Sequence, residues 1–267
     1  MAETAGMGVR RFGRINWIGL GTLAEREIRR FMAVWTQTLL APLITAGLFL
    51  AVFTLAIGPT RGEVMGVPFT NFLAPGLLMM QVIQNGFANT SSSIMIAKVQ
   101  GNIVDTLMPP LSPLEMVVGY MAGAVARGLF VAAAILTVMI LAIGATVAHP
   151  LWLVTFVVLG AAFLGGLGIT AAIFATKFDQ MAAITNFVIV PLSFLSGTFY
   201  SIERLPGTFQ TLTHLNPVFY LIDGARYGMI GRSDSSPWLG LGVLVVATGV
   251  VLALCWYWFR RGYRLKS

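Results

Sequence analysis

The sequence predicts an all-α integral membrane protein, and three observations lead to this fold class. Of the 267 residues, 57% are hydrophobic and only 10% are charged, whereas a soluble domain carries about 25% charged residues. The mean hydropathy is +0.83. The apolar residues also gather in long runs, and roughly 20 apolar residues in a helix cross about 30 Å of hydrocarbon.

Six apolar runs are predicted to form transmembrane helices, at residues 34–57, 71–93, 114–145, 150–175, 180–200 and 237–259. They divide the chain into two parts. Residues 1–32 form a cytoplasmic N-terminus with an amphipathic interfacial helix, and residues 33–267 form a six-helix transmembrane domain. That domain contains an inner loop at 94–113 and an outer loop at 201–236.

The positions of lysine and arginine predict the orientation of these helices. If both termini lie on one side, that side holds twelve basic residues and the opposite side four. The positive-inside rule then makes both termini cytoplasmic. The net charge of +7 is therefore a topology signal, and nucleic-acid binding is not expected. The twelve are Arg10, Arg11, Arg14, Arg26, Arg29, Arg30, Lys98, Lys177, Arg260, Arg261, Arg264 and Lys266, and the four are Arg61, Arg204, Arg226 and Arg232.

The segment before the first span is predicted to be an amphipathic helix along the cytoplasmic interface. One face carries Trp17, Leu20, Ala24, Ile28, Phe31 and Trp35, with Arg26, Arg29 and Arg30 largely opposite. An ordinary flank of a signal anchor is the alternative. In the outer loop, two short apolar helices are predicted on either side of Asn216 and Pro217, and we expect them to re-enter the outer leaflet.

The second predicted span is unusually polar along one face. Its stripe contains Gln81, Gln84, Asn85, Asn89 and Ser92, spaced by three and four residues. In the fifth span, Asn186, Ser193, Ser196 and Tyr200 are predicted to share one face. The two stripes are candidates for lining a substrate route, and dry hydrogen bonding between helices is the alternative.

Arg127 lies deep in the third predicted span, where a charge costs roughly 3 kcal/mol on insertion scales. It should face the bundle interior or extend to an interface.

Several kinds of chemistry are excluded or weak. A P-loop needs a lysine after a glycine, and none of the three lysines, Lys98, Lys177 and Lys266, follows one. His149 and His214 lie in different loops, and a lone Cys255 gives no metal set. An enzyme based on Asp223 and Asp234 is the weakest hypothesis, because Asp223 and Arg226 read better as a local ion pair.

The sequence resembles the ABC-2 type permease family, the membrane subunits of ATP-driven exporters. The resemblance rests on the order of several segments along nearly the whole chain: "AEREIRRF", "FLAPGLLMM", "GNIVDTLMPPLSPLEMVVGY", "LSFLSGTFYSIERLP" and "LNPVFYLIDGARYG". It implies a homodimer that recruits a separate P-loop ATPase, which would bind ATP and magnesium while this chain binds no cofactor. It also implies that spans two and five lie at the dimer interface.

The resemblance further implies that the inner loop docks in the ATPase through a short coupling helix. Its candidate residues are Gly101, Ile103, Asp105, Leu107 and Met108. The leading hypothesis is thus a multi-pass exporter permease of the bacterial inner membrane that moves an amphipathic, drug-like or lipid-linked substrate. A secondary carrier or channel that needs no ATPase is the alternative.

Overall fold

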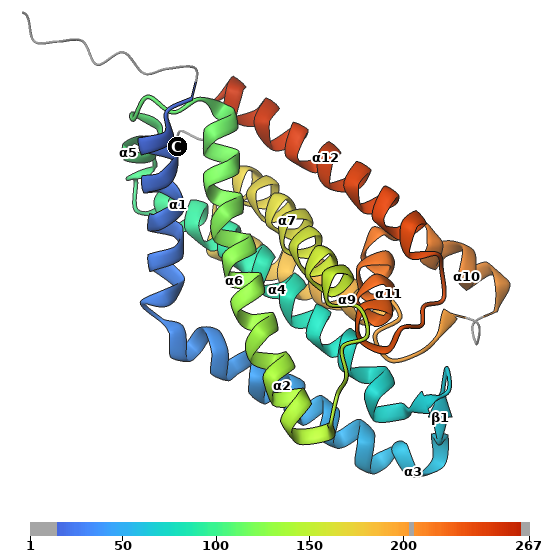
Figure 1. Ribbon diagram of the computed structural model, residues 1–267. Coiled ribbons are helices and arrows are strands. Elements are labelled where there is room, and N and C mark those ends of the chain that lie inside the picture. Colours follow the sequence, from blue (N-terminus) through green and yellow to red (C-terminus); the bar gives the residue numbers. More distant parts are fainter. Residues whose placement is uncertain (1–14, 203–205, 263–267) are drawn as a thin grey trace, which may run out of the picture.

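The computed structural model describes residues 15–202 and 206–262, which are almost entirely helical (Figure 1). The helices are α1 (Trp17–Met32), α2 (Trp35–Ala56), α3 (Gly58–Arg61), α4 (Phe69–Val99), α5 (Ile103–Leu107), α6 (Pro113–Ile143), α7 (Pro150–Phe174), α8 (Phe178–Ile184), α9 (Val190–Leu195), α10 (Gly207–His214), α11 (Pro217–Ile230) and α12 (Pro237–Arg261). A π-helical segment, η1 (Thr185–Ile189), lies between α8 and α9, and two short antiparallel strands, β1 (Glu63–Val64) and β2 (Val67–Pro68), precede α4. Outside the described residues lie Arg10, Arg11, Arg14, Arg204, Arg264 and Lys266, together with the side chains of Pro59, Arg61 and the predicted coupling residue Leu107.

Each predicted span falls on a long helical segment. Five segments of the described chain are long and apolar enough to cross a membrane: α2, α6, α7, α12 and the run through α8, η1 and α9. α4 covers the second predicted span and has 31 residues, but its polar side chains keep it outside that group. The all-α membrane class is confirmed, and the crossing by α4 stays a prediction.

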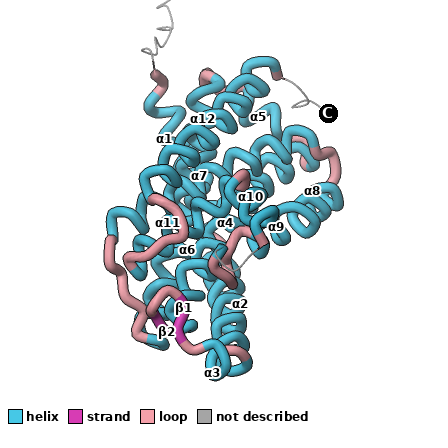
Figure 2. Tube along the Cα trace, turned by 90° about the vertical axis from the view of Figure 1, so that its right-hand side faces the viewer, coloured by secondary structure: helices cyan, strands magenta, loops and turns pink. Residues whose placement is uncertain are grey.

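The long helices give the molecule two distinguishable ends. The α5 end contains the start of α1, the end of α4, α5, the start of α6 and the end of α12 (Figure 1). The α3 end contains α3 and the two strands, far from α5 (Figure 2). α11 and the start of α12 also lie away from the α5 end. The end of α11 contacts the residue before α7, where the His149 amide donates to the Gly228 carbonyl at 2.8 Å.

α4 is the central helix, because it packs against α7, α6, α2 and α11. Small residues let it approach α7 closely. A Cβ added at Gly168 would come within 2.3 Å of the Thr90 hydroxyl and 2.5 Å of the Phe87 carbonyl oxygen. Thr90 also donates to the Gly165 carbonyl at 2.6 Å. The central pair of helices therefore combines backbone proximity with a buried interhelical hydrogen bond.

The end of α4 is fixed to the end of α7 by Lys98. Its Nζ donates to the carbonyl oxygens of Ala172, Ile173 and Ala175 at 3.0, 2.9 and 2.6 Å. Carbonyls in the last turn of a helix lack intrahelical partners, and the helix dipole favours a cation there. Lys98 therefore caps α7 in addition to contributing charge at the α5 end.

α1 runs beside the first half of α6 (Figure 1). The tryptophans of the predicted apolar face are exposed, Trp17 at 70% and Trp35 at 54%, while Leu23, Glu27 and Phe31 are buried. The physical reason is that lipid is as apolar as a protein core, so an apolar face need not turn inward. The interfacial position of α1 stays a prediction.

The fifth predicted span contains a π-helical turn. η1 separates α8 from α9, and Pro191 follows at the start of α9. A π turn holds one extra residue, so side chains before and after it change faces. Asn186 is accordingly exposed, whereas Ser193 is fully buried. The predicted single face from Asn186 to Tyr200 is therefore wrong, and Tyr200 lies beyond the end of α9.

A Gly168→Ala substitution tests the contact between α4 and α7. The added methyl would overlap the Thr90 hydroxyl and a fixed carbonyl, and overpacking of this kind costs about 1–3 kcal/mol. We expect a lower Tm in thermal unfolding of the purified protein. Gly249→Ala on α12 is the matched control, since nothing lies within 4 Å of its Cβ position. Equal Tm values for the two variants would contradict this packing.

Candidate functional site

The polar stripe of α4 lies inside the molecule and is covered by α1 and α6. Gln81, Asn85 and Asn89 are buried, while Gln84 and Ser92 are half-buried. The Nδ2 of Asn85 donates to the Gln81 carbonyl at 3.0 Å. In contrast, the side-chain nitrogens of Gln81 and Asn89 are buried without a hydrogen-bond partner among the described residues. The stripe thus contains buried hydrogen-bond donors that have no partner among the described residues.

Arg127 of α6 meets the middle of this stripe. Its Nε donates to the Oδ1 of Asn85 at 3.1 Å. Within the described ranges, no carboxylate lies close enough to Arg127 to form an ion pair. Arg127 therefore turns toward the bundle, as predicted, and its charge is compensated only by an amide oxygen.

A buried carboxylate on α1, Glu27, joins three helices near the α5 end. Its Oε1 accepts from the Ser93 hydroxyl at 2.7 Å and from Arg26 at 3.1 Å, and its Oε2 accepts from Arg30 at 3.4 Å. On the α6 side, a Cβ added at Gly123 would come within 2.5 Å of the Glu27 Cβ. A buried charge needs such partners, because its desolvation is costly. We call Glu27, Arg26, Arg30 and Ser93 the α1 junction.

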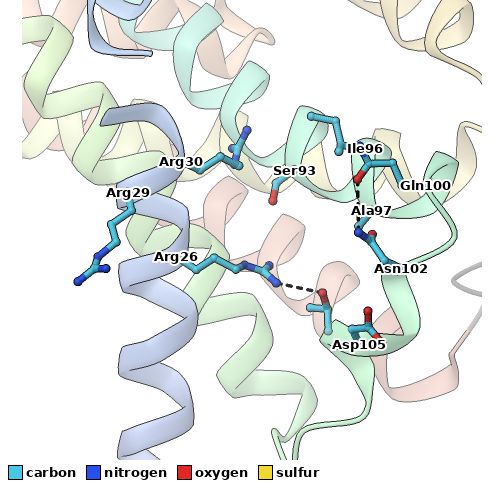
Figure 3. A pocket seen from close by; sticks show the side chains of 10 residues that line it. Arg26, Arg29, Arg30, Ser93, Ile96, Ala97, Gln100, Asn102 and Asp105 are labelled. Atoms are coloured by element: carbon cyan, nitrogen blue, oxygen red, sulfur yellow. Dashed lines mark hydrogen bonds between the residues drawn. The ribbon is translucent and has the colours of Figure 1, made fainter. Parts of the chain in front are cut away.

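Arg30 extends the α1 junction to the polar stripe. It donates to the backbone carbonyl and the Oδ1 of Asn89 at 2.5 and 3.1 Å, and to the Ser92 hydroxyl at 3.0 Å. The sequence groups Arg30 with Arg26 and Arg29 opposite the apolar face, and the structure directs Arg30 toward α4 while Arg29 points away (Figure 3). Glu27 precedes Arg30 by one turn on the inner side and attracts its guanidinium.

Arg26 extends the α1 junction in the other direction, to α5. It donates to the Thr106 hydroxyl at 3.0 Å and to the Tyr120 hydroxyl at 3.4 Å. Burial alone lowers the pKa of Arg26, but Tyr120 and Glu27 more than offset this, so its pKa lies above the usual value. The guanidinium therefore stays charged, and α5 is connected to α1 by a charged hydrogen bond.

An open pocket of about 490 Å³ lies between α1, the end of α4 and α5 (Figure 3). Arg26 and Arg30 extend from α1 toward α5 and α4, whereas Arg29 points away from them and pairs with Glu25 at 2.5 Å. The two residues of this pair are one helical turn apart. The lining residues are Arg26, Arg29, Arg30, Ser93, Ile96, Ala97, Gln100, Asn102, Asp105 and Thr106.

The predicted coupling residues lie around α5 and differ in exposure. Gly101 has a φ of +74°, the left-handed region that glycine adopts without strain, and this turn leads from α4 to α5. Ile103 is buried, so its side chain is not available to a partner in this arrangement. Met108 is 76% and Val104 42% exposed, and Asp105 is also exposed.

The polar residues in and after α9 make local contacts and do not meet the α4 stripe in the described hydrogen bonds. Ser193 and Ser196 each donate to the carbonyl four residues earlier, at 2.8 and 2.5 Å. Ser196 also accepts from the Nδ2 of Asn216, at 2.8 Å, and Asn216 caps α11. The Tyr200 hydroxyl donates to the Leu195 carbonyl at 2.6 Å.

A second buried charged cluster lies away from the α5 end. Arg226 is fully buried and donates to Asp234 at 3.1 Å, to the Gly197 carbonyl at 2.6 Å and to Asp223 at 3.5 Å. Asp223 also accepts from the amides of Asp234 and Ser235 at 2.7 and 2.9 Å. The predicted pair of Asp223 and Arg226 is confirmed, and it belongs to a network that holds the start of α12 against α11.

This network argues against an enzyme based on Asp223 and Asp234, because Arg226 already binds both carboxylates. Nowhere in residues 15–202 and 206–262 do three or more His, Cys, Asp or Glu side chains come together as a metal set. His149 and His214 both pack against aromatic rings of α11, as expected for residues at helix ends.

The sequence interpretation missed Glu27, although a signal was present. Glu27 follows Leu23 by four residues and precedes Phe31 by four, which places it on the same helix face as two apolar residues. The buried residues of α1 are these three. The tryptophans, which are the most conspicuous apolar residues of this segment, lie on the other face.

A bundle of apolar helices around a polar helix, with a charged junction leading to a short exposed helix at one end, is the architecture of a membrane transport subunit. The ABC-2 type transporter family matches residues 19–230, and the chain belongs to this family. The inner membrane transport permease YadH of Escherichia coli (strain K12) is 38% identical over 251 residues, which cover 94% of this chain and 98% of YadH. Nodulation protein J of Rhizobium leguminosarum bv. viciae is 28% identical over 248 residues, with 88% and 90% covered, and that of Neorhizobium galegae is 26% identical over 239 residues, with 87% and 88% covered.

A Glu27→Gln substitution tests the α1 junction. It leaves Arg26 and Arg30 without their shared carboxylate, and we expect a loss of about 2 kcal/mol in the free energy of unfolding. Glu25→Gln is the matched control, because Glu25 and Arg29 are 57% and 79% exposed and such pairs contribute about 0–1 kcal/mol. Thermal unfolding of both variants in the same detergent provides the comparison. A Glu27 variant as stable as the control would contradict the junction.

Proposed function

We propose that this protein is the permease subunit of an ABC exporter in the bacterial inner membrane. Two copies would form the translocation route, and a separate P-loop ATPase would supply the energy. The α1 junction is the observation that carries the proposal, because it connects exposed α5 to the polar stripe of α4 through charged hydrogen bonds. Membership of the family and the similarity to YadH support the transport class.

The six-span topology belongs to this proposal, with both termini cytoplasmic. The starts of α1 and α6 and the ends of α4 and α12 share the α5 end, and this arrangement supports an even number of crossings (Figure 1). α4 lies between α7, α6 and α2, which are apolar enough to span, and this position supports a crossing by α4. We expect α10 and α11 to form the outer re-entrant segment.

The ATPase would dock on the exposed side of α5, at Val104, Asp105 and Met108. Apolar side chains at 42% and 76% exposure beside a carboxylate suit a partner groove with a basic rim. ATP and magnesium would bind to that partner. Docking would displace α5, and the bond from Arg26 to Thr106 would transmit the displacement to α1.

The route would open by a population shift. In this arrangement α1 and α6 cover the α4 stripe, which suits a closed state. ATP binding would favour a second arrangement only if the ATPase binds it more tightly. The resemblance placed spans two and five at the dimer interface, but α4, the second span, is buried among α7, α6, α2 and α11 and offers no face to a second copy in this arrangement. The second copy would instead pack on the exposed apolar face of α2 or of the α8 to α9 segment, and the cargo would be an amphipathic, drug-like or lipid-linked molecule.

Recruitment of the ATPase provides a direct test. Gly101→Val places a β-branched residue at positive φ, which costs roughly 1–2 kcal/mol and displaces the turn before α5. We expect loss of the ATPase from affinity-purified permease. Gly62→Val is the matched control, since Gly62 has a φ of +60° at the opposite end of the molecule. Stoichiometric ATPase in both preparations would refute docking at α5.

The same preparations distinguish the alternative function. If no ATPase is recovered with the wild-type chain and an ion gradient drives transport by that chain alone, the protein is a secondary carrier or channel.

The role of the stripe is tested with Asn85→Leu. The substitution removes the acceptor of Arg127 and a polar group of the route, so we expect ATP-driven transport to fall roughly tenfold while the ATPase stays bound. Thr137→Leu is the control, because Thr137 is exposed on α6 and bonds only within its helix. Loss of ATPase binding together with transport would instead show that Asn85 is structural.

A further inference from the structure

Arg127 and its neighbours carry more positive charge than the chain neutralises. Arg26 and Arg30 share one carboxylate, that of Glu27, and Arg127 pairs with none of the described carboxylates. Arg127 and Arg30 bind Asn85 and Asn89, which are one turn apart on α4. Three guanidinium groups therefore stand against a single buried acid where α1, α4 and α6 meet.

The unpaired hydrogen-bonding groups in this region are donors, which, like the positive charge, favour an anionic ligand. Among the described residues where α1, α4 and α6 meet, the buried nitrogens without a partner are the Nε2 of Gln81, the Nδ2 of Asn89 and the Nε of Arg30, and all three are donors. The side-chain oxygens of Asn85 and Asn89 already accept from Arg127 and Arg30. The unpaired groups of the site therefore need a ligand that supplies hydrogen-bond acceptors.

Asn89 places a buried donor without a partner between α4 and α6. It is fully buried, and its Nδ2 lies 3.0 Å from the position of a Cβ on Gly123, one turn along α6 from Arg127. A fully buried amide without a partner is rare in proteins, because an unmade hydrogen bond is costly. A ligand that supplies acceptor oxygens would satisfy it.

We propose that Arg127, with Arg30 and Asn89, binds the acidic headgroup of an amphiphile, a phosphate or a carboxylate, from the leaflet at the α5 end. Guanidinium groups form paired, charge-assisted hydrogen bonds with such oxygens. This inference deepens the proposed function by making the cargo an anionic amphiphile. A resident bilayer lipid offers the same headgroup chemistry, so the test separates the two sources.

The binding test uses the purified complex in neutral detergent with two fluorescent probes that have the same acyl chains. One is NBD-labelled phosphatidic acid, and the other is the NBD-labelled diacylglycerol that lacks the phosphate. We expect saturable binding of the acid, little binding of the diacylglycerol, and roughly tenfold weaker binding of the acid by Arg127→Gln. Arg127→Lys keeps the charge and should restore part of the affinity.

Arg260→Gln is the matched control, since Arg260 is exposed at the α5 end and packs on Trp256. Unchanged binding by Arg127→Gln, or equal binding of both probes by the wild-type complex, would overturn the inference. Asn89→Ala provides a second variant in case Arg127→Gln does not fold, and it should also bind the acid more weakly. Wild-type affinity in a folded Asn89→Ala protein would equally overturn the inference.

Vesicles of neutral lipid that contain the labelled acid show whether the bound headgroup belongs to the cargo or to a resident lipid. ATP-driven transfer of the label between leaflets identifies the acid as cargo, and binding without transfer identifies a resident lipid. Recovery of the ATPase is measured in the same preparations. Its absence would refute the proposed function while leaving the binding result intact, so the two failures are distinguishable.

Discussion

The arrangement of this protein depends on one buried carboxylate, that of Glu27. An acid with no exposure must be met by donors, and α4 and α1 supply them through Ser93, Arg26 and Arg30. Those arginines reach in opposite directions, toward Thr106 on α5 and toward Asn89 on α4. Because both arginines bind the same carboxylate, we expect a displacement of α5 to change the environment of the stripe.

Two other features hold the remaining helices together. The close approach of α4 and α7 at Gly168, together with the Lys98 cap on α7, joins the central helices rigidly. At the far side, Arg226 ties Asp223 to Asp234 and so holds the start of α12 against α11. In the proposed mechanism, α1 with α5 would be the part that moves, since its bonds are charged and lie beside an open pocket.

The sequence predicted the long helices well, because apolar runs of membrane length have few other solutions in a helical protein. It also singled out Arg127, since a charge within such a run is conspicuous. It missed the buried Glu27 on α1, and it was wrong for Asn186, because a π turn leaves no trace in a 3.6-residue periodicity. The role of α5 followed only from the family resemblance, as its five residues carry little pattern.

Hydrogen–deuterium exchange tests the central claim most directly, by comparing the wild type with Glu27→Gln in the same detergent. If the carboxylate holds α1, α4 and α5 together, amides in α5 and in the last turns of α4 exchange faster in the variant. Amides in α11, which depend on the Arg226 network, keep their rates. Unchanged exchange in α5 and α4, or equal acceleration throughout the chain, would contradict the account.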